Sequence, residues 1–241
     1  MQMKKLFNYG VLFFVLVFAS FLMAFSSYRH DQKTVGEVET KVFGNQGLFI
    51  TNETVNNLLK QNQDSLENEL NSAINLHTLE GRIAKHPLVE EALVYQDVNG
   101  GLGVEVYQKT PVLRVYADDS SYYLDDSGDT MPLSENFTAR VPMYRGPWND
   151  QVKKDVYSLM ETLTEDLFWS RELIGVSRTK EDGYLLYTRT GNHLVVVGSL
   201  KGLDTKLEKY EIFLATAMNQ GLAKEYKKVN LKFNNQVVCS K

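Results

Sequence analysis

The sequence has few groups of residues whose types and spacing would support catalysis. The four histidines are His30, His77, His86 and His193. None of them stands in an H-E-x-x-H or another metal-binding spacing, and none lies close in sequence to a carboxylate pair of the glycosidase type. Ser127-Gly128 lacks the G-x-S-x-G elbow, and no helix is predicted after the glycines of 100–103, as a phosphate loop would require. We expect His77 and His193 to be surface or turn residues. These spacings predict no catalytic residue.

Two further features bear on metal and redox chemistry. The acidic run Asp125 to Asp129 lacks the alternating D-x-D-x-D-G frame of a calcium loop and the glutamate at its twelfth position, so we interpret it as a hairpin turn with Gly128 at its tightest point. Cys239 is the only cysteine, so it has no partner for an intramolecular disulfide and no cluster for zinc. We therefore expect no metal and no cofactor.

The composition indicates a folded chain. The 241 residues are 43% hydrophobic, with 26 Lys and Arg against 30 Asp and Glu and a net charge of −4. These values are typical of one or two globular domains, and the acidic balance argues against nucleic-acid binding.

An apolar run near the amino terminus predicts a membrane anchor. Residues 6–25 contain no charged side chain, and twenty helical residues span about 30 Å, the thickness of the hydrocarbon core of a bilayer. A secretory signal peptide is the alternative, but its apolar core is usually only about 7–15 residues long. We predict a cytoplasmic tail over 1–5 and a transmembrane helix over 6–28, with the bulk of the chain outside the cytoplasm.

The next segment predicts a small α+β domain. Val35, Val38, Val42 and Phe43 indicate a short strand. A helix is expected to begin at Thr51 or Asn52 and to bury Val55, Leu58 and Leu59. A second helix begins at Asn75, buries Leu76, Leu79 and Ile83, and ends before Pro87. Two strands around Asn99-Gly100 then form a hairpin. The predicted unit has two helices on one face of a three-stranded sheet.

The remaining chain predicts a β-rich unit with flanking helices. A hairpin is centred on Gly128, a helix capped by Asn149 or Asp150 runs to Leu163, and three strands at 174–176, 184–187 and 194–197 form a meander. A capping-box spacing from Thr205 to Glu208 predicts a helix that buries Leu207, Phe213, Leu214 and Met218 and ends at Gly221. The chain is expected to end in one strand, from Lys228 to Cys239, which either completes the sheet or offers its edge to a partner.

Four stretches, together with the anchor, resemble the bacterial cell-division FtsQ (DivIB) family. They are INLHTLEGRIAKHPLVEEALVY at 74–95, LGVEVYQKTPVLRV at 102–115, YYLDDSGDTMPLSENFTARVP at 122–142, and the terminal VNLKFNNQVVCSK. Pro87, Val89 and Ala92 match the P-x-V-x-x-A element found in domains of the POTRA type. The resemblance implies a transmembrane helix, a POTRA domain over 36–109 and a β domain over 110–241.

The resemblance also implies a function without enzymatic activity. Members of the family are single-pass type II proteins of the inner membrane, with the bulk of the chain in the periplasm. There they hold FtsB and FtsL, join early to late components of the division complex, and help regulate septal peptidoglycan synthesis by FtsW and FtsI. FtsB adds a strand to the edge of the terminal strand. Carried over to this sequence, the partner-binding residues are Val229, Asn230, Leu231, Lys232, Phe233, Asn234, Gln236, Val237 and Val238.

A different kind of POTRA-bearing protein is the alternative, namely an export or outer-membrane assembly factor. Such a protein needs a long series of alternating strands after its POTRA units. The second segment contains helices and too few strands for that, so we favour the division scaffold.

Overall fold

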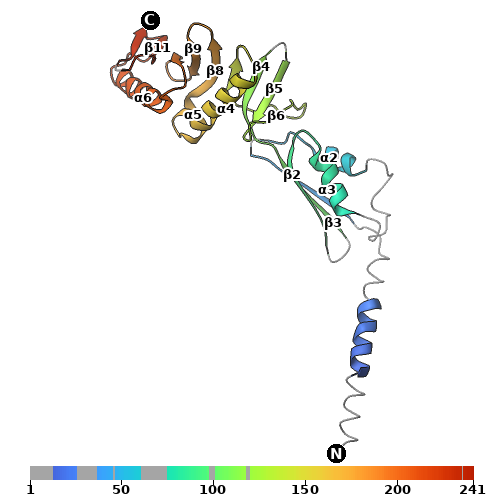
Figure 1. Ribbon diagram of the computed structural model, residues 1–241. Coiled ribbons are helices and arrows are strands. Elements are labelled where there is room, and N and C mark those ends of the chain that lie inside the picture. Colours follow the sequence, from blue (N-terminus) through green and yellow to red (C-terminus); the bar gives the residue numbers. More distant parts are fainter. Residues whose placement is uncertain are drawn as a thin grey trace, which may run out of the picture. The chain divides into compact units, whose positions relative to one another are not determined.

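The chain folds into two compact units. The computed structural model describes residues 13–25, 37–45, 47–60, 75–97, 101–117, 120–234 and 236–241 (Figure 1). The first unit comprises residues 1–43 and 50–108, and the second comprises residues 44–49 and 109–241.

The described part of the predicted anchor is helical. Residues 13–25 form this helix, and the rest of the 6–28 prediction lies outside the described residues. Within the described ranges, no helix has both the length and the apolar content that crossing a membrane requires.

The first unit has the predicted order of strand, helix, helix, strand, strand. Its elements are β1 (Val38–Phe43), α2 (Asn52–Leu59), α3 (Leu76–Ala84), β2 (Val89–Gln96) and β3 (Leu102–Gln108). Both helices begin at the predicted caps, because the Thr51 hydroxyl accepts a hydrogen bond from the Thr54 N–H and the Asn75 side chain accepts one from the Thr78 N–H, each at 3.1 Å. The predicted order of elements and both caps are confirmed. Leu58 and Leu76, which were predicted to be buried, are only partly buried, and the predicted Asn99-Gly100 turn lies outside the described residues.

Strand β3 lies at the centre of the three-stranded sheet. It pairs in parallel with β1 and antiparallel with β2, so both of these are edge strands. Helices α2 and α3 cover one face of the sheet (Figure 1) and bury Val55, Leu59, Leu79 and Ile83. No helix of the described chain covers the other face.

The second unit is a nine-stranded sheet with three helices. Its elements are β4 (Pro111–Ala117), β5 (Ser120–Asp125), β6 (Thr130–Met131), β7 (Met143–Arg145), α4 (Asp150–Glu165), α5 (Trp169–Glu172), β8 (Leu173–Thr179), β9 (Gly183–Thr188), β10 (Leu194–Gly198), α6 (Leu203–Asn219), β11 (Lys228–Asn230) and β12 (Val238–Ser240). The strand order is β12-β11-β10-β9-β8-β7-β4-β5-β6. The Gly128 hairpin, helix α4 and the β8–β10 meander confirm the sequence predictions, whereas β4, β7 and α5 were not predicted.

One register row shows how this sheet makes its core. Neighbouring residues across eight strands belong to a single row, which is Tyr122, Val115, Tyr144, Val176, Leu186, Val195, Val229 and Cys239. The buried members of this row pack in one cluster with residues of α4, α5 and α6. Because side chains alternate along a strand, the two adjacent rows lie on the opposite, helix-free face.

Two predictions near the carboxyl terminus were wrong. Helix α6 begins at Leu203 after Gly202, which has a φ of +64°, so Thr205 is not its cap; Tyr210 and Ala217 are buried in place of Met218, which is 56% exposed. The terminal segment is not one strand, because β11 and β12 are separate strands that pair antiparallel with each other.

Candidate protein-binding edge of the second sheet

The carboxyl-terminal hairpin ends the nine-stranded sheet. Strand β11 lies between β10, to which it is parallel, and β12, to which it is antiparallel. Strand β12 is last in the strand order, and no strand of the described chain pairs with its outer edge. The backbone available for an added strand is therefore that of β12.

The register indicates which groups of β12 point outward. Leu231 donates its N–H to the carbonyl of Val196 at 2.9 Å, and Leu194 donates to the carbonyl of Lys227 at 2.7 Å, so alternate residues of β11 face β10. Lys228 and Asn230 therefore face β12, where they pair with Ser240 and Val238. By alternation, the N–H and C=O of Cys239 point away from the sheet.

Lysine side chains fix the hairpin to neighbouring elements. Asp182, in the turn between β8 and β9, accepts hydrogen bonds from Lys228 at 2.9 Å and from Lys232 at 3.0 Å. These bonds hold the pKa of the Asp182 carboxyl below its usual value. Lys209 of α6 donates to the backbone carbonyl groups of Phe233 and Asn234. The sheet edge is thus held before any partner arrives, which reduces the ordering entropy lost on binding.

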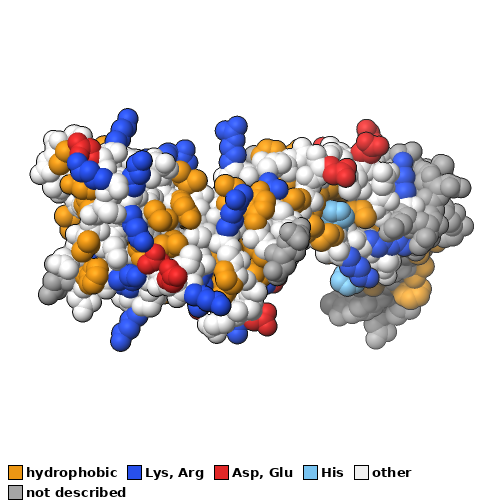
Figure 2. Space-filling model, turned by 90° about the horizontal axis from the view of Figure 1, so that it is seen from above, with side chains coloured by type: hydrophobic (Ala, Val, Ile, Leu, Met, Phe, Trp, Pro, Cys, Tyr) orange, Lys and Arg blue, Asp and Glu red, His pale blue; other side chains and the backbone are white. Residues whose placement is uncertain are grey.

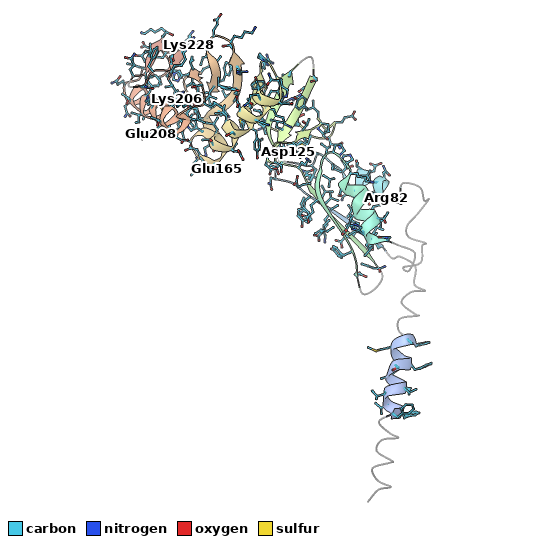
Figure 3. All side chains as sticks on the ribbon, viewed as in Figure 1. Arg82, Asp125, Glu165, Lys206, Glu208 and Lys228 are labelled. Carbon is cyan, nitrogen blue, oxygen red and sulfur yellow. The ribbon has the colours of Figure 1, made fainter. Side chains whose placement is uncertain are left out.

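The predicted site residues divide into three groups. Val229 and Leu231 are fully buried in the core, and Val237 is partly buried against it. Asn230 is half-buried, and its side chain accepts the N–H of Lys232 at 3.0 Å. The exposed residues are Lys232, Phe233, Asn234, Gln236 and Val238, with Phe233 45% and Val238 43% exposed. Lys228 of β11, labelled in Figure 3, anchors the hairpin near its end of the sheet.

Cys239 is the residue of this edge that sequence reasoning did not assign. Its thiol is partly buried against the core while its backbone faces outward. Burial raises the pKa of the Cys239 thiol, so the reactive thiolate is disfavoured at neutral pH. The alternation of the terminal residues could have indicated that the Cys239 backbone faces outward, but only once the strand register is known.

The residues first considered for chemistry serve the fold. His193 is 1% exposed, so the expectation of a surface or turn position was wrong. Its Nε2 donates to the carbonyl of Ala223 at 2.6 Å, and its Nδ1 lies 3.0 Å from the Tyr210 hydroxyl. His77, with 96% of its side chain exposed, is on the surface as expected.

The acidic hairpin is a closed structural unit. Asp125 is fully buried, and its carboxylate accepts the N–H groups of Ser127 and Asp129 together with a hydrogen bond from Lys109. In the described part of the chain, no three His, Cys, Asp or Glu side chains are grouped so that they could hold a metal ion. Among the described residues, the features of the second unit that could bind another protein are therefore the outer edge of β12 and the exposed apolar side chains beside it.

Comparison with known proteins places the two units in a class and then in a family. A model of POTRA-like domains matches residues 42–107, so the first unit is a POTRA-like domain. The model described as FtsQ/DivIB, C-terminal related, matches residues 110–240, which is more than half of the chain. The chain belongs to this family, and membership supports a role in cell division.

One curated relative agrees with this assignment. The chain is 29% identical over 173 residues to the cell division protein FtsQ of Salinibacter ruber. The aligned region covers 65% of this chain and 66% of that relative, so the chain spans just under two thirds of the relative's length.

Proposed function

We propose that this protein is a non-enzymatic scaffold of the bacterial division complex. It is anchored in the inner membrane by residues 6–28, with its POTRA domain over 36–109 and its β domain over 110–241 in the periplasm. It links early and late components and binds FtsB and FtsL, through which it controls septal peptidoglycan synthesis by FtsW and FtsI. The observation that carries the proposal is the outer edge of β12. This strand ends the sheet of the unit that matches the FtsQ/DivIB family model.

We propose that the partner strand is added to β12 and not to β11. Val229 and Asn230 are paired on both sides, so an added strand would contact Cys239 and its neighbours in β12. Main-chain hydrogen bonds from this edge would supply the pairing, and the exposed Val238 would help choose the partner. Phe233 would be a side-chain anchor beside the edge.

The backbone contribution is tested by Cys239→Pro. Proline removes the outward N–H but leaves the bonds between β11 and β12 in place, and proline is tolerated on a strand edge that faces solvent. We expect capture of FtsB by the full chain to fall at least about tenfold, because a buried acceptor on the partner loses its donor. Cys239→Ala is the matched control, since it removes the same thiol and retains the N–H. Equal capture by both variants would refute strand addition at β12.

The side-chain contribution is tested by Phe233→Ala. An aromatic anchor in an interface commonly contributes about 2 kcal/mol or more, which corresponds to a loss of affinity of about thirtyfold. His77→Ala, in the POTRA-like domain, is the control at an exposed position. Titration of each variant of the full chain with the ectodomain of FtsB gives the readout, and an affinity of Phe233→Ala equal to that of the control would contradict the assignment.

A further inference from the structure

The helix-free face of the POTRA-like sheet is an ordered grid of three rows. Cross-strand neighbours, read in the order β2, β3, β1, are Tyr95-Gly103-Glu39, then Leu93-Glu105-Lys41, then Glu91-Tyr107-Phe43. Large apolar side chains stand at four of the nine positions and are 36–45% exposed; they are Phe43, Leu93, Tyr95 and Tyr107. A cluster of such residues on one sheet face is typical of a surface that binds a protein.

Internal contacts hold this grid in shape. The two oxygens of Glu105 accept hydrogen bonds from the hydroxyls of Tyr95 at 3.1 Å and Tyr107 at 3.3 Å. The ring of Tyr107 also stacks on that of Phe43, with centroids 5.0 Å apart. Because the aromatic side chains are already fixed, little side-chain entropy remains to be lost when a partner binds.

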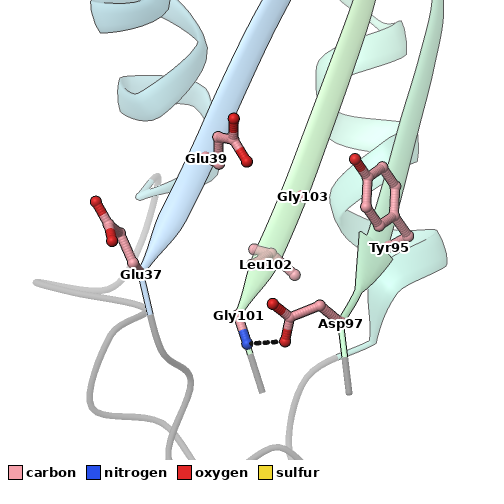
Figure 4. Close-up of a pocket in the computed structure, with 7 residues that line it drawn as sticks. All are labelled: Glu37, Glu39, Tyr95, Asp97, Gly101, Leu102 and Gly103. Atoms are coloured by element: carbon pink, nitrogen blue, oxygen red, sulfur yellow. Dashed lines mark hydrogen bonds between the residues drawn. The ribbon is translucent and has the colours of Figure 1, made fainter. Parts of the chain in front are cut away.

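The glycine in the first row creates a hollow at one end of the face. A β-carbon at Gly103 would lie 2.4 Å from the Tyr95 ring, so only glycine lets that ring lie across the strand. Figure 4 shows the hollow beside it, with a volume of about 510 Å³, which Tyr95 lines together with Glu37, Glu39 and Asp97; the Asp97 carboxylate accepts the N–H of Gly101 at 2.7 Å. An aromatic ring beside carboxylates is an environment that suits an ammonium or guanidinium group.

The charge of the face is one-sided. The grid carries Glu39, Glu91 and Glu105 against a single cation, Lys41, which is itself paired with Glu39 at 3.0 Å. The hollow adds Glu37 and Asp97. Such a surface repels anionic lipid and acidic segments and attracts cationic ones.

We propose that this face docks a segment of a partner protein that carries lysine or arginine beside apolar residues. The apolar side chains of the segment cover Leu93, Tyr107 and Phe43, and one basic side chain enters the hollow against Tyr95. The inference does not depend on the β12 edge, which lies in the other unit, so either proposal can fail alone.

The test is photo-crosslinking from Leu93 in the full chain in its native host, followed by sequencing of the cross-linked peptide. Leu93 is 40% exposed, and the control position Ile174, on β8, is 39% exposed. We expect position 93, but not 174, to capture a protein segment that has more Lys and Arg than Asp and Glu within about two helical turns of the cross-link. A second copy of this chain, a lipid, an acidic segment, or no capture above the control would each overturn the proposal.

Charge reversal provides the matched comparison. Glu39→Lys/Glu91→Lys should reduce capture from position 93 about fivefold to tenfold, whereas Glu161→Lys/Glu165→Lys on α4 changes the net charge equally and should leave it unchanged. If the lysine variant fails to fold, Glu39→Gln/Glu91→Gln replaces it in the comparison. This milder variant should give a smaller loss of capture in the same direction. Equal capture by the face and α4 variants would refute a role for charge.

Discussion

The helix-free faces of the two sheets follow the same alternation but carry opposite charge. The POTRA-like face has three glutamates and one lysine in its grid. The corresponding face of the second sheet has two rows, which are Ser121, Tyr116, Arg145, Ser177, Leu185, Val196, Asn230 and Val238, and Tyr123, Arg114, Met143, Gly175, Tyr187, Leu194, Lys228 and Ser240. These rows contain three cations and no carboxylate, and one of the cations, Lys228, is paired with Asp182 of the neighbouring turn at 2.9 Å. The chain's small net charge of −4 therefore conceals two surfaces with different chemistry.

Aromatic rings organise the charges on both faces, in different ways. In the POTRA-like domain, tyrosine hydroxyls donate to Glu105. In the second unit, the guanidinium groups of Arg114 and Arg145 lie 5.0 and 5.3 Å from the centre of the Tyr116 ring. Figure 2 shows one face of the molecule, on which basic side chains are interspersed with hydrophobic ones over the second unit. The two sheets therefore differ in how their aromatic rings contact charged groups: carboxylate oxygens in the POTRA-like domain and guanidinium groups in the second unit.

The largest expected effect tests whether the two units are independently stable. Trp169 is fully buried, and its Nε1 donates to Glu211 at 3.0 Å. Trp169→Ala should destabilise the second unit by about 3–5 kcal/mol, because it removes a large core side chain. Hydrogen exchange read by mass spectrometry should show faster exchange in the second unit alone. Faster exchange in α2 and α3 as well would show that the units unfold together.

Next in size is the effect of adding a side chain at Gly103. Gly103→Val places side-chain atoms where the Tyr95 ring lies, so we expect a loss of about 1–3 kcal/mol in the first unit from overpacking. Gly81→Ala in α3 is the control, since nothing lies within 4 Å of its added β-carbon, and alanine should stabilise that helix by about 0.5–1 kcal/mol. Denaturant unfolding measures both. A loss of stability in both variants would mean that glycine matters for another reason.

A smaller effect concerns the basic face. Arg145→Gln removes one cation from the Tyr116 ring and should cost about 0.5–1 kcal/mol, because the contact is partly solvent-exposed. Thermal unfolding gives the measurement. Arg140→Gln, an exposed arginine outside the two rows, is the control and should be nearly neutral. Equal effects would mean that the ring contact contributes nothing.

The smallest effect is pH-dependent and belongs to the hairpin anchor. The pKa of Asp182 is lowered by hydrogen bonds from Lys228 and Lys232, so its stabilisation is present above the ordinary value of 3.8 and is lost as the pH falls through the lower folded value. Because the group is partly exposed, we expect less than about 1 kcal/mol. Asp182→Asn should therefore be less stable than the parent at pH 7 and equally stable at the acidic end of the titration. A difference that persists there would exclude the ion pairs as its cause.

Local patterns were sufficient for most of the first unit. Thr51 and Asn75 are helix caps whose side chains accept hydrogen bonds from N–H groups only three residues ahead. Pro87 prevents α3 from continuing, because proline has no backbone N–H and its ring clashes with the preceding turn. The two partners of each interaction lie within a few residues of each other, so their spacing in the sequence is enough to predict the contact. The same holds for Asn149 and α4.

Distant packing decided what the patterns missed. Strand β7 is only three residues long, and it is recognisable as a strand because β4 and β8 pair with both its sides. His193 is buried because Tyr210 and Ala223 arrive from α6 and the segment after it. Propensity cannot report a partner that lies tens of residues away.

By itself, the sequence determined the two units and their main helices and hairpins, because these depend on local periodicity and turn chemistry. It also contained the stretches that resemble the FtsQ (DivIB) family, and it showed no recognisable catalytic motif. Only the tertiary structure decided that the terminal residues form a hairpin, that the free edge belongs to β12, and that glutamates from three strands share one face. Strand pairing brings together residues distant in sequence, and alternation within one strand does not specify which neighbour it will meet.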